Sequence, residues 1–185
     1  MKELYVVGKD ILKSFSDVDF GLEDKSMSCA KRRTIVRGIV VDQAGNVAVF
    51  NKGNANEYKL PGGVVKNDES TEETFLKEIK RGIGCEIEII EDIGIVEEHM
   101  GQDDIIQETY VYVGRVLEKG KIDYNNQEID EFGKVMWVSP EEALKLISDY
   151  KKEIDNQDIE NVYHTKFSVY RDEFISRYYL IKYIY

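Results

Sequence analysis

The stretch "LPGGVVKNDESTEETFLKEIKRGIGC", residues 60–85, decides how this chain is interpreted, because it places two glycines ahead of a well-delimited helix. Ser70 and Glu73 form the S-x-x-E pattern of a capping box, and Gly84 lies where a helix commonly ends in a left-handed residue. The pattern predicts a helix over residues 70–83. Its apolar residues recur at helical spacing, so we expect that stripe to face the core. The stripe consists of Phe75, Leu76, Ile79 and Ile83.

The opposite face of this predicted helix has an unusual set of residues near its end. Glu78, Arg81 and Gly82 are spaced i, i+3 and i+4, so they share one face. Gly62 and Gly63 predict a tight turn that brings backbone close to that face without a Cβ in the way. A glycine turn beside a carboxylate suits a diphosphate with a bridging Mg²⁺, whereas a solvated acidic helix face is the alternative.

This segment resembles the Nudix box, G-x5-E-x7-R-E-U-x-E-E-x-G-U, in which U is an aliphatic residue. Five positions of this chain match the pattern at the right spacing. They are Gly63, Glu69, Glu78, Ile79 and Gly84.

Three polar positions of the box differ, which makes it degenerate. Lys77 occupies the place of the arginine, and Arg81 and Gly82 occupy the places of the two metal-binding glutamates. Glu78 corresponds to the remaining glutamate, and Cys85 takes the final U position.

The flanking sequence is also similar to the Nudix hydrolase superfamily. "LPGG" at residues 60–63 is a typical lead-in, and "WVSPEEA" at residues 137–143 resembles a downstream stretch of the family. The resemblance covers roughly residues 33–148 and implies an α+β fold, an α/β/α sandwich around a mixed β-sheet. Glu131 lies where some members carry an extra catalytic or metal-binding carboxylate, and Glu128 or Asp130 are alternatives for that role.

The resemblance implies a hydrolase that cleaves a diphosphate linkage in a nucleoside diphosphate derivative, using Mg²⁺ or Mn²⁺. Water attacks a phosphate whose charge the metal neutralises, and a glutamate orients or deprotonates that water. The resemblance implies that Glu78 and Glu131 are the catalytic and metal-binding residues. The substrate- and phosphate-binding residues are Gly62, Gly63, Lys77, Arg81 and Arg37.

The departures from the box weaken the expectation of metal binding. The formal charges of Glu78, Arg81 and Gly82 cancel, and a guanidinium about 5 Å from a dication would be repelled by roughly 6–7 kcal/mol at an effective dielectric of about 20. A single Mg²⁺ held by Glu78, Glu131 and the substrate phosphates is still compatible with the sequence. The alternative to a hydrolase is an inactive module of the same fold that binds a nucleotide or a protein partner.

The rest of the chain predicts a mixed sheet covered by helices. "TIVRGIVVDQAGNVAVFNKG", residues 34–53, reads as a hairpin, and residues 86–100 and 108–120 read as further strands. A strand then leads into a second helix, for which Ser139 is the N-cap and Pro140 the first residue. We expect a Nudix-like domain over residues 1–150, although residues 1–30 carry no motif.

Residues 151–185 predict an added helical extension. Its aromatic and aliphatic residues follow a 4-3-4-4-3-4 spacing along one face. A helix packed on its own core is the first interpretation, a homodimer formed through the C-terminal helix the second, and ligand stacking the third. The stripe consists of Tyr163, Phe167, Tyr170, Phe174, Tyr178, Ile181 and Tyr185.

Other polar residues give weaker signals. The acidic run at residues 97–104 could supply replacement metal ligands, but such a run is usually a solvated loop. His99 and His164 lack visible partner spacing, so each reads as a surface or packing residue. Arg33 and Arg37 lie on the strand that contacts the nucleotide in such enzymes, with a structural role equally compatible.

Composition limits the partners and the location. A formal net charge of −11 argues against a nucleic acid polymer as the ligand, because such binding needs a basic surface, but it allows a small-molecule nucleotide in a local pocket. Cys29 and Cys85 lack zinc or redox spacing, which suggests reduced thiols. There is no apolar leader and no uncharged stretch of membrane-spanning length, so we expect a cytoplasmic protein.

Overall fold

The computed structural model describes residues 9–52, 56–66, 68–122 and 133–185. They form a mixed eight-stranded sheet in the order β1-β6-β7-β2-β3-β4, with β5 paired to β2 and β8 paired to β3. The strands are β1 (Ile11–Ser16), β2 (Lys31–Val41), β3 (Val47–Lys52), β4 (Glu57–Lys59), β5 (Gly62–Val64), β6 (Cys85–Met100), β7 (Ile105–Lys119) and β8 (Lys134–Val138). The β1–β6 and β2–β7 pairs are parallel.

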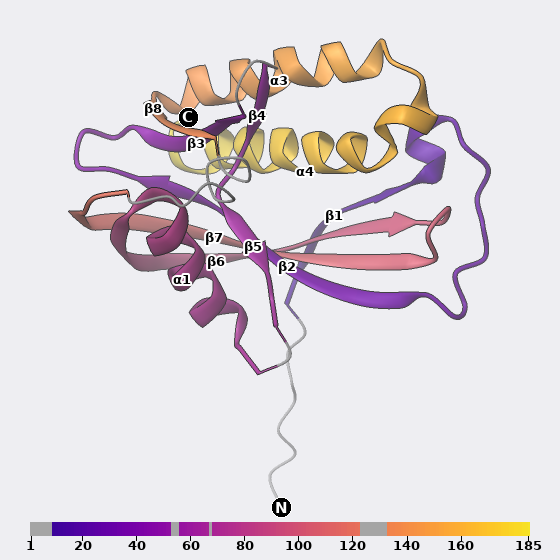
Figure 1. Cartoon of the computed structure of the whole chain (residues 1–185), viewed down its shortest axis with the longest axis horizontal. Coiled ribbons are helices and arrows are strands. Elements are labelled where there is room, and N and C mark those ends of the chain that lie inside the picture. Colours follow the sequence, from indigo (N-terminus) through magenta and orange to yellow (C-terminus); the bar gives the residue numbers. More distant parts are fainter. Residues whose placement is uncertain (1–8, 53–55, 67, 123–132) are drawn as a thin grey trace, which may run out of the picture.

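Helices cover both faces of this sheet, as Figure 1 shows. The described helices are α1 (Thr71–Ile83), α3 (Pro140–Asp155) and α4 (Ile159–Tyr183), with a short 3-10 helix η1 (Asp17–Phe20) after β1. Alternate residues of β2 face opposite sides, so that Val36 packs in the cluster that contains Phe75 of α1, whereas Ile39 packs with residues of α3 and α4. The predicted α/β/α sandwich with a mixed sheet is therefore confirmed.

Helix α1 forms as the local sequence signals predict. The Ser70 hydroxyl accepts a hydrogen bond from the Glu73 amide at 3.1 Å, and Glu73 accepts one from the Ser70 amide at 3.0 Å. Gly84 ends the helix in a left-handed conformation with φ of 67°. The prediction that the whole stripe faces the core is wrong for Leu76, which is 39% exposed. Phe75 and Ile79 are fully buried, as predicted.

The two glycines before α1 lie in a strand rather than in the predicted tight turn. The chain bends at Pro61, and Gly62 and Gly63 then pair with Arg37 and Val36 of β2 as part of β5. The Gly38 amide donates a hydrogen bond to the Pro61 carbonyl at 3.0 Å, which fixes the bend against β2. The backbone of β5 therefore lies beside Arg37.

The C-terminal helix packs on the same hydrophobic cluster as α3, in agreement with the first interpretation of the tail. Tyr163 and Phe167 are buried, but Ile181 and Tyr185 at the far end of the stripe are 66% and 86% exposed. Burial in the second half of α4 moves to other positions, among them Ile175 and Tyr179, because the helix faces both α3 and the sheet. The homodimer and the division into a domain and an extension stay predictions.

The N-terminal region adds one strand. Within residues 1–30, β1 forms from the "DILKSF" segment and pairs with β6, whereas the "ELYVVG" segment lies outside the described residues. Among the described residues, no helix combines the length and the apolar character that crossing a membrane requires.

Candidate functional site

A cleft with a volume of about 370 Å³ opens between β2, the β4–β5 segment and α1. Five cationic side chains and one carboxylate line it within the described part of the chain. All the predicted site residues that are described line it, namely Gly62, Gly63, Arg37, Lys77, Glu78 and Arg81. The other lining residues are Phe50, Lys59, Leu60, Val64 and Lys66.

Glu78 and Arg81 point toward each other, as their spacing on α1 predicts. The Arg81 Nη2 atom lies 2.7 Å from the Glu78 Oε2 atom, and the Glu78 side chain is only 12% exposed. Gly63 makes room for this carboxylate, because a Cβ at Gly63 would lie 2.6 Å from the Glu78 Cγ atom and 2.8 Å from its Oε2 atom. The close approach therefore depends on a residue without a side chain.

Lys77, which occupies the place of the box arginine, has its partner outside α1. Its ammonium group pairs with the Glu69 carboxylate, which also accepts a hydrogen bond from the Thr74 hydroxyl at 3.1 Å. The hydrogen bond from Lys77 holds the pKa of Glu69 below its usual value. Lys77 thus ties the middle of α1 to the segment before the helix, and the cation paired with Glu78 is Arg81.

Two half-buried cations, Arg37 and Lys59, line the cleft from the sheet side. Arg37 donates from Nη1 to the Val36 carbonyl at 3.1 Å, while its buried Nε has no hydrogen-bond partner among the described residues. Burial, with repulsion from Arg171, lowers the pKa of Arg37 to about 10. Burial and repulsion from neighbouring cations lower the pKa of Lys59 to about 8. Loss of hydration is the main cause of both shifts, so an anionic ligand in the cleft would stabilise both charges.

Among the residues that the structure describes, Glu78 is the carboxylate that this cleft offers to a metal ion. Mg²⁺ needs oxygen ligands, and within the described ranges no group of three or more His, Cys, Asp or Glu side chains could hold a metal ion. Glu78 is engaged by Arg81. Glu131 lies outside the described residues, as do the alternatives Glu128 and Asp130, so their predicted metal-binding role stays a prediction.

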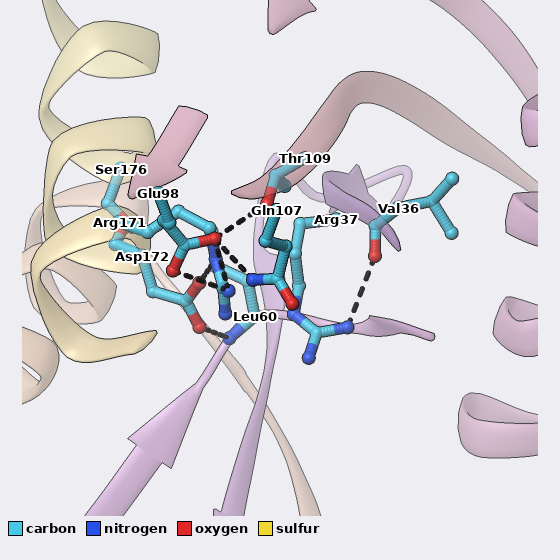
Figure 2. A network of polar contacts seen from close by, with 9 residues as sticks. All are labelled: Val36, Arg37, Leu60, Glu98, Gln107, Thr109, Arg171, Asp172 and Ser176. Atoms are coloured by element: carbon cyan, nitrogen blue, oxygen red, sulfur yellow. Dashed lines mark hydrogen bonds and ion pairs between the residues drawn. The ribbon is translucent and has the colours of Figure 1, made fainter. Parts of the chain in front are cut away.

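A buried ionic network that was not predicted from the sequence lies next to the cleft (Figure 2). Glu98 of β6 is fully buried, and its carboxylate oxygens lie 3.2 and 3.3 Å from the Arg171 Nη1 atom of α4. Gln107 and Thr109 of β7 donate to the same carboxylate. The expectation of a solvated loop or replacement metal ligands is thus wrong for Glu98, because β6 carries it into the interior.

Asp172 connects this network to the wall of the cleft. One of its carboxylate oxygens accepts a hydrogen bond from Arg171 Nε, and the other accepts from the Leu60 backbone amide, each at 2.9 Å. Leu60 directly precedes the bend at Pro61, so α4 holds the segment that leads into β5. An Arg-Asp pair inside an aromatic helix gives no sequence signal for this role.

Neither histidine lines this cleft. The His99 Nε2 atom is 3.1 Å from Glu97 Oε2, and the His164 Nε2 atom is 3.3 Å from Asp103 Oδ2. Each histidine thus has a carboxylate partner that its spacing did not reveal. Arg33 is exposed on β2, in contrast to Arg37 on the same strand.

The NUDIX domain family model matches residues 31–158 of this chain. The chain belongs to the Nudix family. The matched region contains β2 to α3 and every predicted site residue of the cleft, and it ends directly before Ile159, the first residue of α4. The Nudix domain therefore supplies α1 and the glycine strand, while the helix that holds Leu60 lies outside it.

Solved Nudix structures are similar to this chain at low sequence identity. A Nudix hydrolase from Nitrosomonas europaea aligns with a TM-score of 0.50 and 16% identity over 66% of this chain and 90% of its own. A UDP-X diphosphatase aligns with a TM-score of 0.48 and 16% identity, over 74% and 70% of the two chains. An ADP-ribose pyrophosphatase from Streptococcus suis aligns with a TM-score of 0.45 and 19% identity, over 59% and 75%. No curated protein sequence matches significantly.

Proposed function

We propose that the chain binds a nucleoside diphosphate derivative in the cleft and hydrolyses its diphosphate linkage. The observation that carries this proposal is the position of Glu78 in a Nudix-fold cleft that five cationic side chains line. Lys and Arg side chains stabilise phosphate oxygens in the ground state and in the transition state. A carboxylate among them can orient and deprotonate the attacking water.

In this reaction the water oxygen forms a bond to one phosphorus atom while the bond from that phosphorus to the bridging oxygen breaks. Glu78 accepts the proton of the water, and the leaving phosphate takes up the negative charge. Lys66 and Arg81 lie in the same cleft and would stabilise that charge. The proposal includes dependence on Mg²⁺ or Mn²⁺, with Glu78 and Glu131 as ligands.

Binding without hydrolysis is the second candidate function, and the Arg81–Glu78 ion pair favours it. A carboxylate held by a guanidinium group at 2.7 Å is less available to a metal ion or to a water molecule. Arginine also suits phosphate geometry, so Arg81 can contact the diphosphate directly. In this case the cleft would retain a nucleotide, or an anionic group of a protein partner, intact.

One experiment separates the two functions. The native chain, Glu78→Gln and the double variant Arg81→Glu/Gly82→Glu are incubated with nucleoside diphosphate sugars, dinucleoside polyphosphates and nucleoside triphosphates, with Mg²⁺, with Mn²⁺ and with a chelator. For a hydrolase we expect turnover by the native chain that Glu78→Gln lowers by about 10²–10⁴-fold. Turnover by the double variant alone supports binding without hydrolysis. If neither hydrolyses and no ligand raises the melting temperature of the native chain, both functions are wrong.

A further inference from the structure

A second hollow, of about 160 Å³, adjoins the cleft. The two share Arg37 and Lys59 as lining residues, so a ligand can extend from one into the other. We name it the α4 hollow, because α4 supplies more than half of its wall. Its remaining residues are Glu57, Tyr58, Tyr150, His164, Thr165, Ser168, Val169, Arg171 and Asp172.

The hydroxyl groups of the α4 hollow are available to a ligand. Thr165 and Ser168 lie one turn apart on α4, are half-buried, and make no side-chain hydrogen bond within the described part of the chain. Ser176 of the same helix behaves differently, since its hydroxyl donates to the Asp172 carbonyl at 2.8 Å. Burial and the nearby Glu57 raise the pKa of Tyr150 to about 12, so its hydroxyl can also donate.

Beyond its junction with the cleft, the described part of the α4 hollow does not offer a cation without partners to a second phosphate group. Arg171 and Asp172 are satisfied by each other, by Glu98 and by the Leu60 amide. Arg37, whose buried Nε has no hydrogen-bond partner among the described residues, and Lys59 lie at the junction with the cleft. A ligand that fits both hollows therefore has its anionic part in the cleft and at the junction, and an uncharged polar part beyond it.

We propose that the α4 hollow binds the sugar of a nucleoside diphosphate sugar, which makes α4 the element that selects the substrate. This inference rests on the proposed function, because it needs the diphosphate in the cleft. A sugar presents several hydroxyl groups on a compact ring, and these match the hydroxyls of Thr165, Ser168 and Tyr150 and the carboxylate of Glu57. The family match ends at residue 158, so the α4 part of this wall is an addition to the matched Nudix domain.

The test compares ligands that differ only in the sugar. Dissociation constants are measured by calorimetry for UDP and UDP-glucose, ADP and ADP-ribose, and GDP and GDP-mannose, with chromatography to check that each ligand stays intact. The variants are Ser168→Leu, which fills the hollow, and the milder Ser168→Ala and Thr165→Val, which remove one hydroxyl each. Arg177→Ala, exposed on α4 and outside both hollows, is the control.

We expect the native chain and the control to bind one sugar nucleotide about tenfold more tightly than the nucleoside diphosphate without the sugar. This difference in affinity corresponds to one or two hydrogen bonds. Ser168→Leu should remove that preference and leave the affinity for the diphosphate within about twofold, and each mild variant should lower the preference several-fold.

Binding of the diphosphates without any preference for a sugar overturns the inference and leaves the proposed function intact. Equal losses for both ligands of a pair in Ser168→Leu also overturn it, since they place the nucleoside in the hollow. If no diphosphate binds, the proposed function fails together with the inference.

Discussion

The Asp172 carboxylate in α4 accepts a hydrogen bond at 2.9 Å from the backbone amide of Leu60, which lies 112 residues earlier in the chain. Both groups are buried. Leu60 leads into the bend and the glycine strand that line the cleft, so a helix outside the matched Nudix domain fixes one wall of the candidate site. Stability of the network and geometry of the cleft are therefore linked.

Replacement of Arg171 by alanine should lower the free energy of unfolding by about 3–5 kcal/mol. Arg171 is 2% exposed, and its loss leaves the buried carboxylates of Glu98 and Asp172 without their cation. For a chain of this size the loss corresponds to a decrease of roughly 6–20 °C in melting temperature, measurable by thermal and urea unfolding.

Arg177→Ala is the matched control for this prediction. Arg177 also lies on α4 and pairs with a carboxylate, that of Glu173, but its side chain is 54% exposed. Exposed ion pairs contribute little, so we expect a loss below about 1 kcal/mol. Similar losses of unfolding free energy for the two variants would show that the buried network stabilises the fold no more than an exposed ion pair does.

Sequence reasoning succeeded where the signals are local. The caps of α1 depend on Ser70, Glu73 and Gly84, which are neighbours in the chain, and the i, i+3 spacing alone places Arg81 beside Glu78. The hairpin between β2 and β3 likewise follows from one turn, where the Asp42 carboxylate accepts from the Asn46 amide at 2.9 Å. These features need no knowledge of the tertiary fold.

Features that depend on distant segments could not be predicted. Glu98 looked like part of a solvated acidic run because its partner Arg171 is 73 residues away. The strand at Gly62 and Gly63 looked like a turn because its partner is the middle of β2. The Asp172–Leu60 contact had no signal at all, since an acidic residue in an amphipathic helix usually faces water.

Gly63→Ala should impair ligand binding and turnover far more than stability. The new Cβ would meet the Glu78 side chain at 2.6–2.8 Å, and that flexible side chain would be displaced from its position beside β5. We expect turnover or ligand affinity to fall by about tenfold or more, with a loss of roughly 1 kcal/mol or less in stability. The measurement pairs calorimetry or steady-state kinetics with urea unfolding.

Gly38→Ala gives the opposite pattern and serves as the comparison. Its Cβ would meet the Phe75 ring at 2.4 Å and the Tyr112 carbonyl oxygen at 2.5 Å, where α1 packs on the sheet. Overpacking of this kind costs about 1–3 kcal/mol or more. A Gly63 variant that loses stability as strongly as the Gly38 variant would contradict the role assigned to Gly63.

Affinity for a nucleoside diphosphate sugar should decrease as pH rises above 8. The pKa of Lys59 is lowered to about 8 by burial and by Lys52 and Arg37, against the opposing charges of Glu57 and Asp172. Below that pH Lys59 is cationic and attracts the diphosphate, and above it the charge is lost in the free protein. The cationic fraction falls about tenfold between pH 7 and pH 9, so the affinity should fall by the same factor.

Lys59→Arg is the control for the pH profile. A guanidinium keeps its charge throughout this range, so the variant should bind with nearly constant affinity from pH 7 to pH 9. Calorimetric titrations at several pH values provide the comparison. A native profile as flat as that of the variant would mean that the Lys59 ammonium does not contribute to anion binding.

Arg81→Ala should change phosphate binding and Mg²⁺ binding in opposite directions. Loss of the guanidinium removes a charge-assisted contact of about 1.5–3 kcal/mol, so affinity for the diphosphate without metal should fall by roughly 10–150-fold. The same change releases the Glu78 carboxylate from its 2.7 Å ion pair, so Mg²⁺ should raise the melting temperature of the variant more than that of the native chain.

Arg115→Ala is the matched control, because Arg115 pairs with Glu88 at 2.8 Å on an exposed part of β7 away from the cleft. Equal Mg²⁺ responses in the native chain and in Arg81→Ala would mean that the ion pair does not limit the access of a metal ion to Glu78, and the main physical reason for the second candidate function would be lost.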